Sequence, residues 1–367
     1  MTDARQEECP MIRIQLAWLV IIFAVSFAPG VRAVSEYSVQ IEKVEGHTTY
    51  HLRDSARHMD VGIVPDIGNF VYQFKVNGKD VLIPPASLAA YVKDRKFCCG
   101  IPFLAPWANR IAGDAYYFEG RKYLLNPELG NFLRDQFGQP IHGLVEYDSR
   151  WEVAKKSASD GEGAALTSRL EFYKYPDLMA QFPFAHTMEI TYRLKDGKLE
   201  NTTELKNGGA AAMPVLIAYH PYFRPDGERG GWVVSNAAQD YWVLNDRLTA
   251  TGEKKPAEDI MPGRKSFHLG THSLDNLFSD LDRSADGLAR VSVKGPKEKI
   301  EVVYGKAYNF AVIYAPLPPS PTLVCIEPQT GPTNAFNLNH EGKFPNLIVL
   351  KPGKIFTAEF SIVPTGF

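Results

Sequence analysis

The sequence predicts an all-β fold of large antiparallel sheets with few, short helices. Turn pairs recur between short apolar segments, and one long segment alternates polar and apolar residues. Aromatic residues make up 12% of the 367 residues, and 29 Gly and 26 Pro suit a chain with many tight turns. Strand signals without interleaved helices indicate a sandwich or a barrel rather than alternating strands and helices. The simplest prediction is one domain of two packed antiparallel sheets.

Three predicted hairpins carry this interpretation. Their paired segments are residues 70–76 and 81–83 around Asn77-Gly78, 115–118 and 122–125 around Glu119-Gly120, and 188–194 and 199–205 around Asp196-Gly197. The alternation in the third hairpin has the period of a half-buried strand. Later strands are expected at residues 300–304, 310–314, 323–326 and 356–362, and the best helix candidate is short, at residues 87–94.

The first 33 residues have the layout of a secretory signal peptide. An apolar run at residues 14–28 follows Arg13, and Val31-Arg32-Ala33 supplies small residues at a cleavage site. Met11 is a better start than Met1, because the residues before it are acidic for such a leader. The alternative is an uncleaved anchor, although the run is short for a membrane span. We expect a periplasmic or secreted protein without stable membrane association after cleavage, with residues 34–367 as a single domain.

The charge and the cysteines exclude several classes of protein. Forty Lys+Arg against 42 Asp+Glu give a net charge of −2, without the basic excess of a nucleic-acid-binding protein. Cys98, Cys99 and Cys325 do not form a disulfide framework, and no spacing of Cys or His suggests a metal site. We expect Cys98 and Cys99 to be buried thiols, with a vicinal bridge as the alternative, and Cys325 to be a small core residue.

The first segment with chemical potential is GIPFLAPWANRI at residues 100–111. Its two prolines and its Trp restrict the backbone, so Asn109 and Arg110 are unusual there unless they face a cavity. An Arg in a structural ion pair is the alternative.

Two histidines occur in aromatic and Gly- or Pro-rich surroundings. His220 follows an apolar run and precedes a proline, and His142 precedes Gly143. A histidine at such a strand end can transfer protons near neutral pH, although a structural role is the common alternative.

A glutamate ends the apolar strand at residues 323–326. Glu327 is followed by Pro328 and Gln329, and an unpaired carboxylate is costly to bury there. It is either half of a buried salt bridge or a general base whose pKa burial raises. Aromatic surfaces, amide and guanidinium groups, and a Glu and a His without a metal suit sugar chemistry.

The order of these motifs resembles the aldose 1-epimerases (galactose mutarotases). The motifs are GIPFLAPWANRI at 100–111, His142-Gly143, HPYF at 220–223, LDNLF at 274–278 and Glu327-Pro328. They cover nearly the whole chain after the leader. The resemblance implies a β-supersandwich with a sugar cleft across one sheet, acting without a cofactor on a glucose- or galactose-like monosaccharide, as a monomer or dimer.

The resemblance also implies a role for each matching residue. Glu327 would be the general base and His220 the general acid of ring opening and closure. His142 would steady the reacting oxygens. The residues that would hold sugar hydroxyls are Arg110, Asp275, Asn109 and Gln329.

Three other functions remain open at this level. A hexose-6-phosphate 1-epimerase would need basic residues near its cleft, for which Arg224 and Arg229 are candidates. A non-catalytic carbohydrate-binding protein would need aromatic platforms but not a paired Glu and His. A polysaccharide-active enzyme would normally need a longer chain. The charged loop at residues 126–140 is expected to reshape the cleft.

Overall fold

Strict alternation of buried and less buried residues builds the largest sheet. The computed structural model describes residues 1–2 and 35–367. In β13 (His186–Lys195) every second side chain is buried, and β14 (Lys198–Asn207) continues the pattern after the Asp196-Gly197 turn. Lys195 pairs with Lys198, which confirms the predicted hairpin. One face of this sheet therefore belongs to the core.

The nine strands of this sheet are all antiparallel to their neighbours. In spatial order they are β11 (Glu152–Ser159), β12 (Gly163–Leu170), β13, β14, β28 (Ile355–Thr365), β24 (Lys299–Tyr304), β23 (Ala289–Lys294), β18 (Val233–Ser235) and β21 (Phe267–His268). The strands predicted at residues 300–304 and 356–362 are the central β24 and β28.

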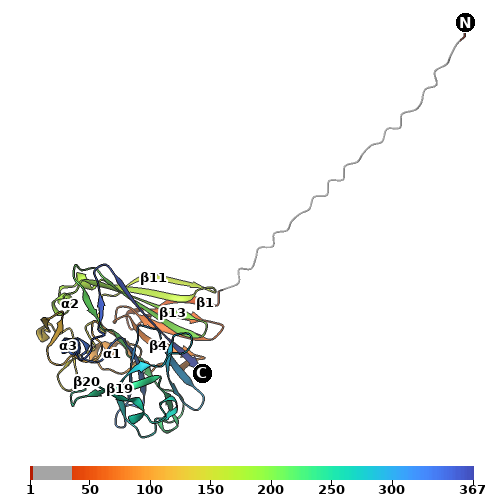
Figure 1. The fold of residues 1–367 in the computed structure, drawn as a ribbon. Coiled ribbons are helices and arrows are strands. Elements are labelled where there is room, and N and C mark those ends of the chain that lie inside the picture. The colour runs from red at the N-terminus through yellow and green to blue at the C-terminus, as the bar shows by residue number, and fades with distance from the viewer. Residues whose placement is uncertain (3–34) are drawn as a thin grey trace. The chain divides into compact units, whose positions relative to one another are not determined.

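An eight-stranded sheet carries three of the predicted site residues, Asp275, Glu327 and Gln329. Its strands are β20 (Ala250–Pro256), β19 (Ala238–Leu244), β22 (Leu274–Leu281), β25 (Phe310–Ala315), β26 (Val324–Gln329), β16 (Ala218–Tyr219) and β6 (Phe103–Leu104), with β17 (Tyr222–Phe223) also paired to β26. Every residue of β26 is buried, as expected for a central strand covered on both faces. Figure 1 shows β11 and β13 on one side of the body and β19 and β20 on the other.

A five-stranded sheet precedes both in the chain. It consists of β1 (Tyr37–Val44), β2 (His47–Asp54), β3 (Met59–Val64), β4 (Phe70–Val76) and β5 (Lys79–Asp80), in sequence order. The Asn77-Gly78 hairpin is confirmed, but its second strand begins two residues earlier than predicted. The two-residue turn pairs Val76 with Lys79, so polar residues take the first ladder positions ahead of the apolar Val81.

Short pairs and helices complete the fold. The strand pairs are β7 (Ala115–Phe118) with β8 (Arg121–Leu124), β9 (Leu133–Arg134) with β10 (Pro140–Ile141), and β15 (Met213–Val215) with β27 (Ile348–Leu350). The α-helices are α1 (Leu88–Asp94), α2 (Pro176–Gln181) and α3 (Ala335–His340). Single 3-10 turns lie at Pro127–Leu129, Phe172–Lys174, Arg229–Gly231, Ala257–Asp259 and Arg264–Ser266. Ser87 caps the predicted helix by accepting from the Ala90 amide. The predicted all-β class with few short helices is therefore correct.

One buried tyrosine forms a polar link between the two large sheets. Tyr219 on β16 accepts a hydrogen bond from Asn201 on β14 at 3.1 Å and contacts the Thr203 hydroxyl at 2.6 Å. Its ring also lies 4.9 Å from that of Phe360 on β28, centroid to centroid. Because Tyr219 directly precedes His220, these contacts also restrict the position of His220.

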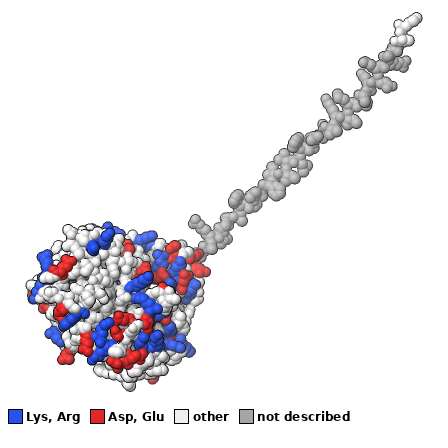
Figure 2. Space-filling model, viewed as in Figure 1, with Lys and Arg blue, Asp and Glu red and all other residues white. Residues whose placement is uncertain are grey.

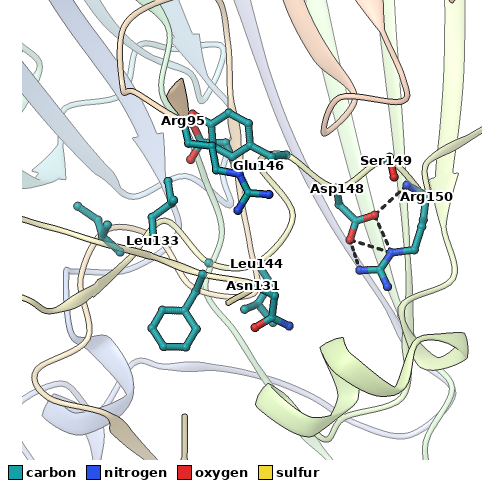
Figure 3. A pocket seen from close by; sticks show the side chains of 12 residues that line it. Arg95, Asn131, Leu133, Leu144, Glu146, Asp148, Ser149 and Arg150 are labelled. Atoms are coloured by element: carbon teal, nitrogen blue, oxygen red, sulfur yellow. Dashed lines mark hydrogen bonds and ion pairs between the residues drawn. The ribbon is translucent and has the colours of Figure 1, made fainter. Parts of the chain in front are cut away.

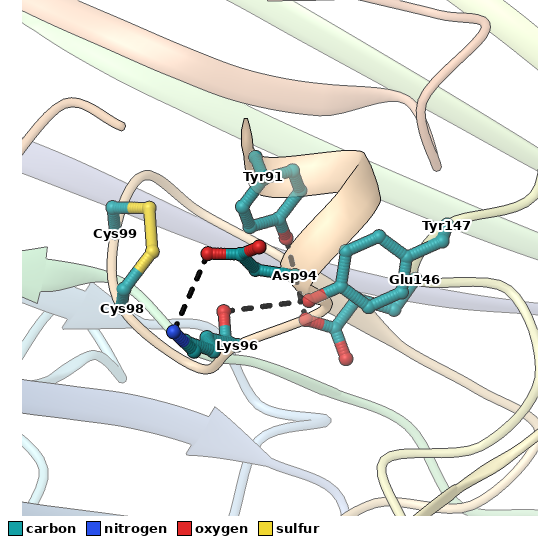
Figure 4. The surroundings of a disulfide bond; sticks show 7 residues. All are labelled: Tyr91, Asp94, Lys96, Cys98, Cys99, Glu146 and Tyr147. Atoms are coloured by element: carbon teal, nitrogen blue, oxygen red, sulfur yellow. Dashed lines mark hydrogen bonds and ion pairs between the residues drawn. A yellow bond between two sulfur atoms is a disulfide. The ribbon is translucent and has the colours of Figure 1, made fainter. Parts of the chain in front are cut away.

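The cysteine pair differs from our prediction. Cys98 and Cys99 form a disulfide, whereas we expected two buried thiols; Cys99 is buried and Cys98 only half-buried. Figure 4 shows both sulfur atoms on the same side of the loop that follows α1. The loop conformation brings the sulfurs together, and adjacency in sequence does not predict that conformation. Cys325 is free and buried, as predicted.

The predicted leader at residues 1–33 lies outside the described residues, apart from Met1 and Thr2. Residues 35–367 cluster as one contact unit. None of the helices in the described part of the chain is long and apolar enough for a bilayer crossing. Over the face seen in Figure 2, Lys and Arg are interspersed with Asp and Glu, in keeping with the small net charge.

The tyrosine between the sheets generates a stability prediction. Tyr219→Phe should lower the free energy of unfolding by about 1–3 kcal/mol, because the buried Asn201 amide loses its acceptor. Urea denaturation measures this loss. Tyr173→Phe removes an exposed hydroxyl contact to Glu171 and should change stability by less than about 0.5 kcal/mol. Equal effects of the two substitutions would contradict the inter-sheet role.

Candidate functional site

Six of the seven predicted site residues line one pocket. Its volume is about 220 Å³, and these six are Asn109, Arg110, His142, His220, Asp275 and Glu327. The seventh, Gln329, does not line it but donates a hydrogen bond to Glu327 Oε2 at 3.2 Å. Side chains separated by more than two hundred positions in the sequence therefore meet at one place, and all seven are placed by the fold at or directly beside this pocket.

Strand β26 explains why Glu327 and His220 meet. It pairs with β16 through Ala218 and Gln329, and with β17 through Tyr222 and Cys325. His220 lies in the two-residue connection between these short strands, so both of its flanks are fixed to the strand that carries Glu327. The His220 amide also donates to the Pro102 carbonyl at 3.1 Å.

The neighbouring strands supply Asp275. It lies on β22 and pairs with Tyr314 on β25, while Val312 on β25 pairs with Glu327. Asp275 is therefore two strands from Glu327 across the sheet, and both carboxylates line the pocket. The predicted motif at residues 274–278 opens β22.

A strained backbone segment places His142. Both His142 and Asn109 adopt the left-handed region, with φ of 64° and 54°, and the His142 amide donates to the Asn109 carbonyl at 2.9 Å. Gly143 follows at φ 76°, and a Cβ there would lie 2.1 Å from the Ala105 carbonyl oxygen. Backbone strain of this kind persists where surrounding structure enforces it, often at functional sites. Only glycine fits at position 143.

The central contact joins His220 Nε2 to Glu327 Oε1 at 3.2 Å. Glu327 is 1% exposed and His220 7% exposed. Burial, with the nearby Asp275 charge, raises the pKa of Glu327 well above its ordinary value. Burial lowers the pKa of His220 to about 3. Each environment favours the uncharged form, so the pair holds one proton that either atom can carry.

Aromatic rings fix both imidazoles. The His220 ring stacks on Tyr222 at 4.5 Å, and His142 meets His220 edge-on at 5.4 Å between centroids. Phe97 packs against the other side of His142 at 4.6 Å. Burial and the proximity of His220 lower the pKa of His142 well below its ordinary value. A neutral His142 can donate or accept a hydrogen bond without adding charge.

Arg110 fits both of its predicted interpretations. It lines the pocket, and its Nε donates to Asp135 Oδ2 at 2.7 Å in a buried ion pair. Its Nη1 donates to the Asn109 amide oxygen at 3.0 Å, which fixes the guanidinium plane. Asp275 is half-buried, and burial raises its pKa while the Arg110 charge opposes that shift.

Several pocket residues were not predicted from the sequence. Asp135 was part of the charged loop that we expected to reshape the cleft, but its partner was not identified. Tyr222 belongs to the HPYF motif, but the motif does not predict that Tyr222 itself lines the pocket. Phe97 and Tyr314 gave no signal, because a lone aromatic residue in a loop or strand does not indicate a pocket. The described residues contain no cluster of three or more potential metal ligands.

Comparison with known proteins identifies the family. The family model described as aldose 1-epimerase matches residues 50–363. The uncharacterized Escherichia coli K12 proteins YihR and YphB are 22% and 23% identical over 71% of this chain, and the matches cover 77% and 81% of those proteins.

Solved structures agree with the fold. A galactose mutarotase-like protein from Clostridium acetobutylicum superposes with a TM-score of 0.78 at 20% identity, covering 90% of this chain and 99% of that one. Galactose 1-epimerase from Lactobacillus acidophilus NCFM gives 0.71 at 16% identity, covering 91% and 100%. At these identities the structural likeness concerns the fold. Because the family model spans most of the sequence, the chain belongs to the aldose 1-epimerase family.

Proposed function

We propose that this protein is an aldose 1-epimerase that interconverts the α and β anomers of a sugar with a free reducing end. The observation that carries the proposal is the buried Glu327–His220 contact inside a pocket of about 220 Å³. A binding protein needs aromatic and polar contacts, but it has no use for an acid and a base held together out of water. Family membership implies a sugar substrate and agrees with this chemistry.

In the proposed mechanism each step moves two protons, one from the sugar to the pair and one from the pair to the sugar. Glu327 takes the proton from the hydroxyl on C1 while His220 delivers a proton to the ring oxygen, and the bond from C1 to the ring oxygen breaks. Rotation about the C1–C2 bond exposes the other face of the carbonyl. Closure reverses the two transfers and inverts C1. After closure the proton can pass from His220 back to Glu327 across the 3.2 Å contact, which restores the uncharged pair.

The surrounding residues hold the sugar. We propose that His142 hydrogen-bonds the reacting oxygens, and that Arg110, Asp275 and Asn109 hold ring hydroxyls. Gln329 is proposed to hold the Glu327 carboxylate rather than the sugar, because its amide contacts Glu327 and lies outside the pocket lining.

The charges in the pocket favour a neutral sugar over a sugar phosphate. Among the described residues, Arg110 is the one cation of the pocket lining, and Asp135 already pairs with it. Neither Arg224 nor Arg229 lines the pocket, and Arg229 donates to the Ala315 carbonyl at 3.1 Å. A phosphate dianion would also face Asp275 and Glu327.

We propose in addition that residues 1–33 direct export and that residues 34–367 are one domain, both from the sequence pattern.

Glu327→Gln should abolish most of the acceleration of mutarotation, by about 10²–10⁴-fold, because the amide cannot accept the C1 proton. Polarimetry on freshly dissolved α-D-glucose and α-D-galactose measures the relaxation to the anomeric equilibrium. Glu298→Gln is the matched control, since Glu298 is also buried but lies outside the pocket. A folded Glu327→Gln protein with nearly wild-type rate would remove Glu327 as the base.

The pH–rate profile should be bell-shaped, with limbs that belong to the pair. Below about pH 3 His220 becomes protonated while Glu327 is still protonated, so the pair has no base. Above the raised pKa of Glu327 the pair loses the proton that it shares, so it has no acid. The rate should therefore fall on both sides of a broad plateau. His220→Asn should lower the rate and displace the alkaline limb. If neither changes, the general acid is another group.

Asp135→Asn should raise KM by about tenfold with a smaller change in kcat, because Arg110 loses the partner that orients it. Asp114→Asn breaks an exposed ion pair with Arg134 in the same region and serves as the control. A fall in kcat with unchanged KM would instead place Asp135 in the chemical step.

A further inference from the structure

A second pocket adjoins the proposed catalytic pocket. Its volume is about 350 Å³, and Figure 3 shows its lining. Three chain segments contribute neighbouring residues to the two pockets: Arg95 and Phe97, Leu133 and Asp135, and Gly143 and His142, while Ile141 lines both. The two pockets therefore adjoin, and these segments form the wall that they share.

The shared wall is held in place by several contacts. Strand β9 pairs with β10 through Leu133 and Ile141. The loop after α1 contains the Cys98–Cys99 disulfide, and its Lys96 carbonyl accepts a hydrogen bond from the Tyr147 hydroxyl at 3.4 Å (Figure 4). The second pocket is thus bordered by constrained segments, and its volume lies within the range of about 300–1,000 Å³ that is typical of ligand sites.

A buried carboxylate in the wall of this pocket has no role in the proposed mechanism. Glu146 is 4% exposed; its Oε1 accepts from the Tyr91 hydroxyl at 3.3 Å, and its Oε2 has no partner in the part of the chain described. Buried polar atoms are normally hydrogen-bonded, so an unpartnered carboxylate oxygen needs an explanation. Burial raises the pKa of Glu146 to about 7, so near neutral pH it can accept from or donate to a hydroxyl.

The other groups suit a neutral, hydroxylated ligand. The Arg95 guanidinium extends into the space above Leu144 and Asn131 in Figure 3, and it forms no ion pair or side-chain hydrogen bond with the described residues. It lies 5.6 Å from the centre of the Tyr147 ring. Asp148 is already paired with Arg150. A guanidinium, a carboxyl group and an aromatic face can bind sugar hydroxyls and a sugar ring.

We propose that this pocket is a second sugar subsite, which binds the unit attached to the reducing sugar in the catalytic pocket. The inference deepens the proposed function: the preferred substrate is the reducing end of an oligosaccharide, not an isolated monosaccharide. The adjoining linings carry this step: His142 and Asp135 line the catalytic pocket, while Gly143, next to His142, and Leu133, two residues before Asp135, line the second.

The test compares kcat/KM for anomer interconversion between glucose or galactose and the reducing disaccharides maltose, cellobiose, lactose and melibiose. At least one disaccharide should exceed its monosaccharide by about tenfold or more, the effect of one charge-assisted hydrogen bond. If none of the four exceeds the monosaccharides, the second subsite is wrong.

Two variants locate the effect. Arg95→Asn should lower kcat/KM for the preferred disaccharide about tenfold and leave the monosaccharide value within about twofold. Asn tolerates the left-handed conformation of position 95, where φ is 47°. Arg121→Asn is the matched control, because Arg121 also lies over a tyrosine ring but outside both pockets. Glu146→Gln should repeat the Arg95→Asn result. Equal losses on both sugars, or loss in the control, would count against the subsite.

Calorimetry separates this inference from the proposed function. If no sugar is turned over, the epimerase proposal fails, and binding of the same disaccharides to the unmodified chain then decides the subsite. Tighter binding of a disaccharide than of its monosaccharide, weakened by Arg95→Asn, supports it. Equal binding, or binding insensitive to Arg95, rejects it.

Discussion

The contact between His220 and Glu327 depends on a single strand that pairs with two short partners. β26 holds β16 on one stretch and β17 on another, and His220 lies in the connection between them. Neither residue can shift without breaking ladder hydrogen bonds on β26. Tyr219, one residue before His220, also fastens this connection to the opposite sheet. The proposed acid and base are thus positioned by the packing of both large sheets, with the precision that proton transfer requires.

Because Glu327 and His220 share one proton, the pair avoids the free-energy cost of burying a charged group. A charged carboxylate as buried as Glu327 would be expensive to desolvate, and Arg110, the cation of the pocket, is bound to Asp135. Its two partners are His220 and Gln329, neither of which carries a permanent charge. The uncharged form of the pair avoids the penalty. The charged form, with the proton on His220, differs only by movement across the contact and is the form that starts the proposed reaction.

Sequence reasoning succeeded where local pattern and tertiary structure agree. Alternation and turn pairs located central strands such as β13, β14 and β28 but left more than half of the strands unassigned, and an acid at the end of an apolar strand marked Glu327 because burial there is costly. It failed where a contact depends on loop conformation. The Arg110–Asp135 pair, the Cys98–Cys99 disulfide and the Phe97 contact to His142 all come from irregular segments. Such segments have no periodicity, so their side-chain partners follow only from the folded chain.

The division between strands and loops also separates chemistry from recognition. Anomer interconversion involves only C1, its hydroxyl and the ring oxygen, so the reacting groups can be identical for many sugars. Glu327 and Asp275 lie on strands of the eight-stranded sheet, and His220 is fixed between two of them. The loops around residues 95–97 and 131–136 form the outer walls and contribute to both pockets. Loops can change in length and sequence without disturbing the sheet. In the proposed second subsite, such elements would bind the part of the substrate beyond the reacting ring. On this view the second pocket is where this chain's preference among sugars is set, while the proton transfer remains the same.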